Sequence, residues 1–96
     1  MLQQITIQTN DAKRLKPLLK SAIQSELRDI EHGIQLTRDR LEAFEKQYAM
    51  STAEFLHRFT PEDLGETLDF TDWYGETKML ALLEEKKKTL EGARVK

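Results

Sequence analysis

The longest regular feature of this sequence is an apolar repeat between residues 19 and 48. Its members follow one another in steps of four and three residues: Leu19, Ile23, Leu27, Ile30, Ile34, Thr37, Leu41, Phe44 and Tyr48. Such steps place side chains along one stripe of an α-helix, as in a coiled coil. Gly33 lies inside the repeat without changing its phase. We therefore predict one long helix over residues 14–48, with Pro17 in its first turn.

Two shorter helices are predicted after the long one. The run Ser51-Thr52-Ala53-Glu54 is a capping box, in which the serine hydroxyl accepts from the Glu54 backbone N–H and the Glu54 side chain reaches back to Ser51. It predicts a short helix over residues 52–59. A last helix is predicted over residues 70–91, with Asp69 or Thr71 as N-cap and Gly92 as C-terminal cap. Its inner face should hold Phe70, Trp73, Leu80, Leu83 and Leu90.

The first ten residues do not continue the helical pattern. Ile5 and Ile7 alternate with polar residues, and this period of two fits a short strand or an extended arm. The chain of 96 residues is thus predicted to be one all-α domain. A long helix, a short helix and an antiparallel C-terminal helix form a helical hairpin, preceded by the N-terminal strand or arm.

The predicted hairpin leaves part of the long helix without cover, because the last helix is the shorter of the two. We expect a second copy of the chain to supply the cover, which makes a homodimer. The residues predicted to form that contact lie in the arm and early in the long helix: Ile5, Ile7, Leu15, Leu18, Leu19, Ala22 and Ile23.

Acidic residues are concentrated in the middle of the chain. Residues 51–77 carry seven acidic residues against the single base Arg58, although the net charge of the whole chain is only −2. Aromatic side chains are interleaved with these acids, a composition found at protein interfaces. The residues predicted to bind a basic protein partner are Glu62, Asp63, Glu66, Asp72, Tyr74 and Glu76.

Nucleic acid is a less favoured partner, because the chain lacks an overall basic charge that would displace counterions from phosphates. One alternative prediction does include DNA as a partner. An N-terminal strand followed by a helix start with Lys13, Arg14, Lys16 and Lys20 resembles ribbon-helix-helix DNA binders, although the first helix is long for that fold.

No pattern in the sequence predicts catalysis, a metal or a cofactor. Asp29 with His32, and Glu54 with His57, have the spacing of carboxylate and imidazole metal ligands, but a di-metal bundle also needs carboxylates from two further helices. Cysteine is absent, and the start of the chain has no apolar region typical of a signal peptide. We expect a cytoplasmic protein that is not an enzyme and has no membrane span.

The run SELRDIEHGIQLTRDRLEAFEKQYAMSTAEFLHRF, followed by an acidic loop and DFTDWYGETKMLALLEEKKKTLEG, carries a family resemblance. It resembles short bacterial and archaeal helical proteins associated with toxin-antitoxin gene pairs, over about residues 17 to 92. The resemblance implies an antitoxin-like partner role. Together with the acidic segment, it leads us to predict a non-enzymatic interaction module that masks a basic partner, a nuclease-type toxin. None of the shared features is a catalytic motif, so no functional residue is carried over.

Two alternatives stay open beside this prediction. The first is a homodimeric coiled-coil scaffold or adaptor, and the second is a ribbon-type DNA-binding autorepressor.

Overall fold

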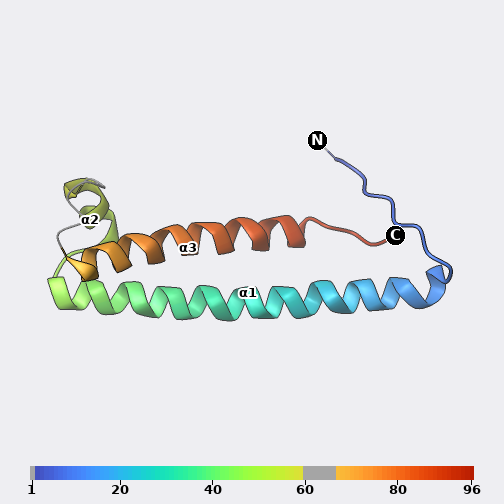
Figure 1. Ribbon diagram of the computed structural model, residues 1–96, viewed down its shortest axis with the longest axis horizontal. Coiled ribbons are helices and arrows are strands. Elements are labelled where there is room, and N and C mark those ends of the chain that lie inside the picture. The colour runs from blue at the N-terminus through green and yellow to red at the C-terminus, as the bar shows by residue number, and fades with distance from the viewer. Residues whose placement is uncertain (1, 60–66) are drawn as a thin grey trace.

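The computed structural model describes residues 2–59 and 67–96. These residues form three helices, α1 (Ala12–Tyr48), α2 (Thr52–Arg58) and α3 (Leu68–Glu91). α1 and α3 lie side by side as an antiparallel hairpin, and α2 lies across the end where the chain passes between them (Figure 1). The molecule measures 56 by 24 by 20 Å. The prediction of an all-α helical hairpin is confirmed.

α1 begins two residues earlier than predicted, at Ala12. Its N-cap is Asp11, whose side chain accepts a hydrogen bond from the backbone N–H of Arg14 at 3.1 Å. Pro17 therefore lies inside the helix and not in its first turn. A proline there leaves one backbone carbonyl without its helical donor, a cost that the strong aspartate cap and the long helix on the C-terminal side can offset.

The turn after α1 depends on an alanine in an unusual conformation. Ala49 has φ 51° and ψ 46°, which is the left-handed region, and its N–H donates to the Glu45 carbonyl. The Glu45 carboxylate accepts from the Thr52 N–H at 2.6 Å and so joins the end of α1 to the start of α2. This connection aims α2 away from the axis of α1.

α2 starts where the capping box predicts, and the Ser51 hydroxyl accepts from the Glu54 N–H at 3.0 Å. The Glu54 carboxylate does not serve the predicted reverse bond, because it lies 3.6 Å from Nη1 of Arg58. α2 ends at Arg58, one residue earlier than predicted, and Phe59 is its C-cap.

α3 begins at Leu68, two residues earlier than predicted, because Thr67 is its N-cap. The Thr67 hydroxyl accepts from the Phe70 N–H at 3.1 Å. The predicted caps Asp69 and Thr71 are thus wrong, since both lie inside the helix. Asp69 instead contacts α1. Gly92 is the C-cap, as predicted.

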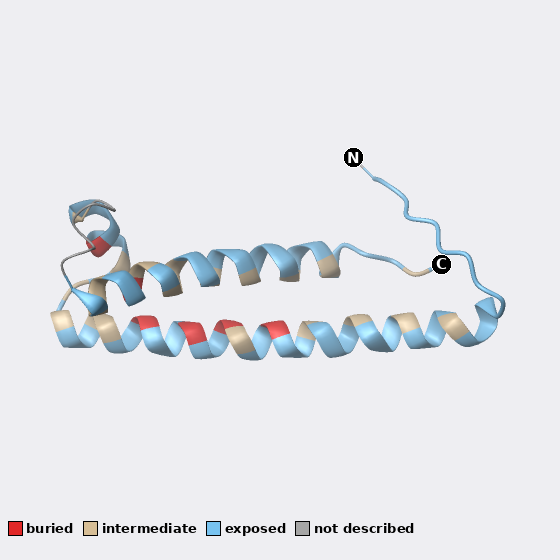
Figure 2. Ribbon diagram, viewed as in Figure 1, coloured by how far each residue is buried: buried red, intermediate tan, exposed pale blue. Residues whose placement is uncertain are grey.

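Burial is concentrated in the half of α1 that α3 covers (Figure 2). The buried side chains of α1 are Ile30, Ile34, Thr37 and Leu41, all members of the predicted repeat. Gly33 lies between them and allows a close approach, because a Cβ atom there would lie 3.3 Å from Cδ1 of Leu83. Three ion pairs also join the helices: Arg40–Glu76, Arg38–Glu84 and Lys87–Glu31.

An aromatic cluster holds α2 against the two long helices. Trp73 and Phe55 are fully buried, and their rings stack at 4.1 Å with an interplanar angle of 1°. The Trp73 indole N–H donates to the Thr52 hydroxyl at 3.0 Å. Around them pack Phe44, Tyr48, Phe59, Phe70 and Tyr74. We call this end of the hairpin the closed end, comprising residues 40–59 and 67–76.

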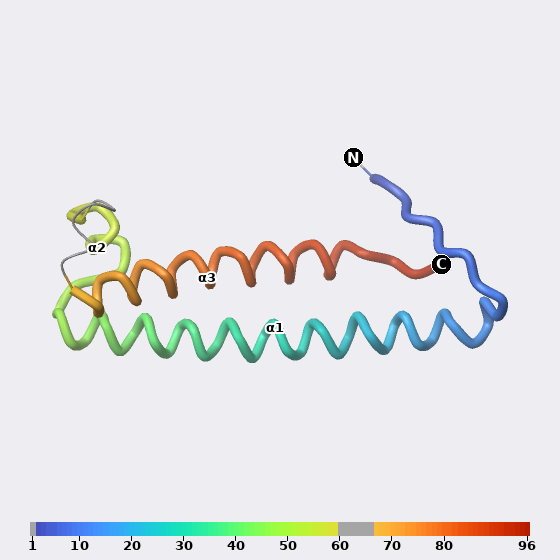
Figure 3. The backbone as a smooth tube through the Cα atoms, viewed as in Figure 1, coloured from blue at the N-terminus to red at the C-terminus, as the bar shows by residue number. Residues whose placement is uncertain are grey.

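The N-terminal residues 2–10 form an extended arm that leaves α1 and turns back over its N-terminal part (Figure 3). No strand forms within the described residues of this single chain. Ile5 is 91% exposed and Leu2 is 98% exposed, so the arm has little contact with the helices.

Candidate functional site

The first candidate surface is the part of α1 that extends beyond α3. Lys87, one turn before the end of α3, lies 3.7 Å from Glu31, so residues 12–25 of α1 lie past the last turn of α3. We call this part the open end. Figure 2 shows no buried residue there. Apolar residues of an amphipathic helix without a cover are a common site of protein contact.

The structure brings together the five predicted dimer residues of the open end. Leu15, Leu19 and Ile23 are half-buried, whereas Leu18 and Ala22 are exposed. The extended residues 93–96 continue along the line of α3, and Val95 among them is half-buried (Figure 1). Ile5 and Ile7, the two predicted dimer residues of the arm, are exposed.

The second candidate surface is a groove at the closed end. An open hollow there lies between α1 and α3, and it is lined by Arg40, Ala43, Phe44, Gln47, Thr71, Asp72, Gly75 and Glu76. Two of the predicted partner-binding residues, Asp72 and Glu76, thus lie in one groove. They are four residues apart on α3, a spacing that places both on one helical face.

Glu76 is already engaged within the chain. Its Oε1 lies 3.1 Å from Nη1 of Arg40, while its Oε2 is buried and has no hydrogen-bond donor within residues 2–59 and 67–96. Asp72 is exposed and has no ion pair in the described part of the chain. Of these two carboxylates, Asp72 is therefore the one that a basic group from outside can approach.

Tyr74 does not belong to this groove. It is half-buried against the aromatic cluster, and Nζ of Lys78 lies 5.1 Å from its ring centroid. Residues two positions apart on a helix point in nearly opposite directions, so Tyr74 cannot share a face with Asp72 and Glu76. The predicted set of six is therefore not one surface. The other three members, Glu62, Asp63 and Glu66, lie outside the described residues.

A third carboxylate of the closed end, Asp69, is held by α1. Its Oδ2 accepts from the Tyr48 hydroxyl at 2.6 Å and from Nε2 of Gln47 at 3.2 Å. The hydrogen bond to Asp69, together with burial and the negative charge of that carboxylate, raises the pKa of Tyr48 above its ordinary value. Asp69 thus ties α1 to α3 and also adds negative potential beside the groove.

The sequence analysis missed a group of exposed apolar residues on the side of the hairpin. Leu36, Met79 and Leu82 are each between 44 and 46% exposed. The signal was present in the helical periodicity, since Met79 and Leu82 are three residues apart and outside the predicted inner face of α3. The prediction covered one apolar stripe on each helix, and these residues form a second one.

The two histidines are exposed. In residues 2–59 and 67–96, no group of three or more histidine, aspartate and glutamate side chains is arranged to hold a metal ion. The helices described here also include none that is long and apolar enough to cross a membrane.

Comparisons with known proteins leave the geometry as the basis for a functional assignment. No protein-family model, curated protein or solved structure matches this chain.

Proposed function

We propose that this chain is a protein–protein interaction module without catalytic activity. One observation carries the proposal: α1 has 37 residues and α3 has 24, so the open end presents apolar side chains that the described part of the chain leaves exposed or half-buried. Leu18 there is 60% exposed. Burial of a leucine side chain contributes about 1.5–3 kcal/mol, so a partner that covers this surface gains stability from it.

The charge of the closed end favours a basic partner. Asp72 has no ion pair in the described part of the chain, and Asp69 and Glu76 lie on the same face of α3. An antitoxin-like role, in which the chain masks a basic nuclease-type toxin, is the specific form of this proposal. A homodimeric scaffold or adaptor is the second candidate, favoured by the uncovered apolar residues of the open end.

The test of the antitoxin-like form is a binding measurement with the purified product of the adjacent gene. Association should slow when salt rises from about 50 to 300 mM, because exposed charges are screened over roughly 10 Å or less. Asp72→Lys should slow association further at low salt. Glu85→Lys is the matched control, since Glu85 is an exposed residue of α3 without an ion pair in the described residues.

Both charge reversals change the net charge equally, so only the position differs. If Asp72→Lys and Glu85→Lys slow association to the same extent, the closed end is not the contact. If the adjacent protein does not bind at all, the antitoxin-like form fails, and the scaffold candidate remains.

A further inference from the structure

A second apolar stripe runs along one side of the hairpin, outside the seam between α1 and α3. Four large side chains form it, and their exposed fractions are 60% for Leu18, 44% for Leu36, 46% for Met79 and 46% for Leu82. Leu18 and Leu36 are separated by 18 residues, about five helical turns, so they leave α1 in the same direction. Met79 and Leu82 are neighbours on one face of α3. We call these four residues the side stripe.

The groove at the closed end identifies which face of α1 and which face of α3 lie on the same side of the hairpin. Ala43 of α1 and Gly75 of α3 line that groove together. Leu36 precedes Ala43 by seven residues, and Met79 follows Gly75 by four, so both lie on the groove side of their helices. The side stripe therefore continues the groove from the closed end toward the open end.

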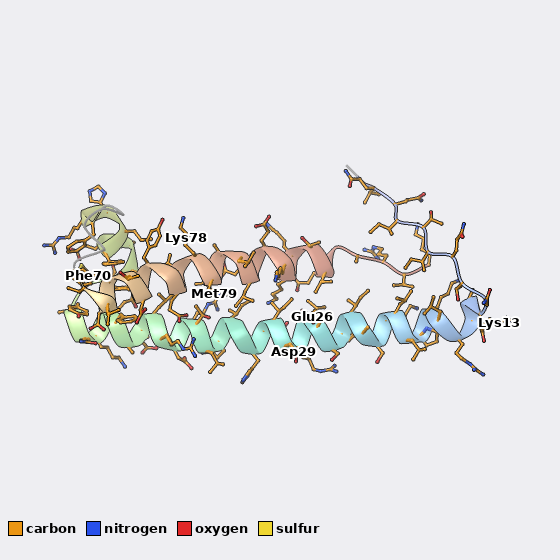
Figure 4. All side chains as sticks on the ribbon, in the orientation of Figure 1. Lys13, Glu26, Asp29, Phe70, Lys78 and Met79 are labelled. Carbon is orange, nitrogen blue, oxygen red and sulfur yellow. The ribbon has the colours of Figure 1, made fainter. Side chains whose placement is uncertain are left out.

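The other side of the hairpin is polar. Arg38 of α1 and Glu84 of α3 form an ion pair of 3.1 Å there, and Lys78 covers the Tyr74 ring. Lys78 and Met79 leave α3 in different directions (Figure 4). Met79 and Leu82, the exposed large apolar residues in the middle of α3, thus lie on one side of the helix, as expected for a surface that meets another apolar surface.

We propose that a second copy of this chain covers the side stripe in antiparallel orientation, so that two hairpins form a four-helix bundle. This inference rests on the proposed function and names the partner. At 1.5 Å per residue, α1 is about 55 Å long and α3 about 36 Å long, so with a width of about 10 Å for each helix their common side covers roughly 900 Å². A specific interface requires roughly 800 Å² from each partner, so the side is large enough.

The charges of the two ends determine the orientation. The open end, residues 12–25, carries the four bases Lys13, Arg14, Lys16 and Lys20 and no acid, whereas the described closed end, residues 40–59 and 67–76, carries six acids and three bases. Lys13 lies at the open end and Phe70 at the closed end, so these charges are at opposite ends of the molecule (Figure 4). Antiparallel packing places basic residues beside acidic ones at both ends of the dimer. Parallel packing would place like charges together, which is unfavourable.

The shape of the groove supports the same orientation. Antiparallel packing about the middle of α1 brings Leu18 of one copy near Ala43 and Gly75 of the other. Among the described residues, a Cβ atom added at Gly75 would meet nothing within 4 Å, so the groove has room for a side chain from the partner. Leu18, the most exposed apolar residue of the open end, is suited to fill it.

The first experiment measures mass by light scattering at about 50 μM. The wild-type chain should have twice its 11.2 kDa mass. Met79→Glu and Leu36→Glu should each weaken the dimer at least 10-fold and leave the helical circular dichroism unchanged, because both side chains are exposed in the single chain. Ala81→Glu is the matched control, since Ala81 is exposed on another face of α3 and the variant should remain a dimer.

The second experiment tests orientation with cysteines, which the natural sequence lacks. Leu18→Cys and Ala43→Cys are prepared as separate proteins and oxidised alone and as a mixture. A disulfide-linked dimer in excess of the random-collision level should form in the mixture. Neither variant alone should show such an excess.

A result that differs from these expectations refutes a specific part of the proposal: the second copy as partner, the position of the interface or the antiparallel orientation. A wild-type mass of 11.2 kDa at this concentration excludes the second copy as partner, whereas binding of another protein would still support the proposed function. Equal weakening by Ala81→Glu and Met79→Glu places the interface elsewhere. Efficient self-linking of Leu18→Cys indicates parallel packing.

Discussion

Replacement of Phe55 by alanine tests the aromatic cluster that holds α2. A seven-residue helix has little stability by itself, because helices shorter than about 12 residues are marginal in water. Phe55 is the only buried residue of α2, at 0% exposure, and its ring stacks on Trp73 at 4.1 Å. α2 should therefore detach when this ring is removed.

The expected loss of unfolding free energy is about 3–5 kcal/mol, the usual range for a phenylalanine removed from a packed core. That is a large part of the roughly 5–15 kcal/mol that stabilises a typical domain. Two other substitutions in the same segment should lower the unfolding free energy less and serve as references for this value. Ser51→Ala should cost about 1 kcal/mol through the lost N-cap bond to Glu54. Leu56→Ala should cost less than about 1 kcal/mol, because Leu56 is 40% exposed.

The assay is urea unfolding followed by the fluorescence of Trp73, the single tryptophan of the chain. Because Trp73 is fully buried against Phe55, its emission should shift to longer wavelength in Phe55→Ala even before urea is added. Leu56→Ala should keep the wild-type emission. A cost for Leu56→Ala equal to or above that for Phe55→Ala would refute the packing of α2 described here.

Three further changes test local features. Ala49→Gly should raise the unfolding free energy by about 1 kcal/mol in urea titrations, because glycine adopts a positive φ without the Cβ penalty; a loss would contradict the left-handed turn. Gly75→Ala should stabilise by up to about 1 kcal/mol in thermal unfolding at low protein concentration, since alanine favours the helix and the site has space. The raised pKa of Tyr48 means that the folded chain holds this proton more tightly than the unfolded chain, so stability should fall as pH rises above 10.0. Tyr48→Phe should reduce that fall in urea midpoints measured from about pH 8 to 11, whereas Tyr74→Phe should retain it, and equal behaviour of the two variants would argue against the Tyr48–Asp69 bond.

The sequence predicted the face of α1 more reliably than the depth of its burial. Ile30, Ile34 and Leu41 are buried, as their spacing indicated. Leu19 and Ile23 follow the same spacing but are only half-buried. Periodicity identifies the side of a helix that faces a partner, whereas burial also requires that a partner reach that far along the helix.

Helix ends were predictable where a local signal was unambiguous. Ser51 is followed three residues later by Glu54, and α2 starts there. The start of α3 has three candidate caps within five residues; Asp69 and Thr71 were predicted, whereas Thr67 is the cap. Asp69 bonds to Tyr48, 21 residues away in sequence, and local patterns do not reveal such a contact.

The acidic partner surface was predicted from composition, and composition does not resolve helical faces. Asp72 and Glu76 are each two residues from Tyr74 in the sequence, yet the tyrosine lies on a different side of α3 from the two acids. A helical-wheel assignment of the segment would have separated them and would also have brought Met79 beside Gly75. Rotation around the helix, and not proximity in the sequence, determines which of these side chains share a surface.

The two glycines inside the long helices show how packing within one chain differs from packing between chains. Each costs about 1 kcal/mol relative to alanine in a helix interior, so each requires a compensating contact. At Gly33 the contact is Leu83, whose Cδ1 would lie 3.3 Å from an added Cβ atom. At Gly75 the described residues of the single chain supply no such contact, because none of them lies within 4 Å of an added Cβ atom. A side chain from a second copy would supply it, and alanine at this position should then strengthen the helix while it weakens the dimer.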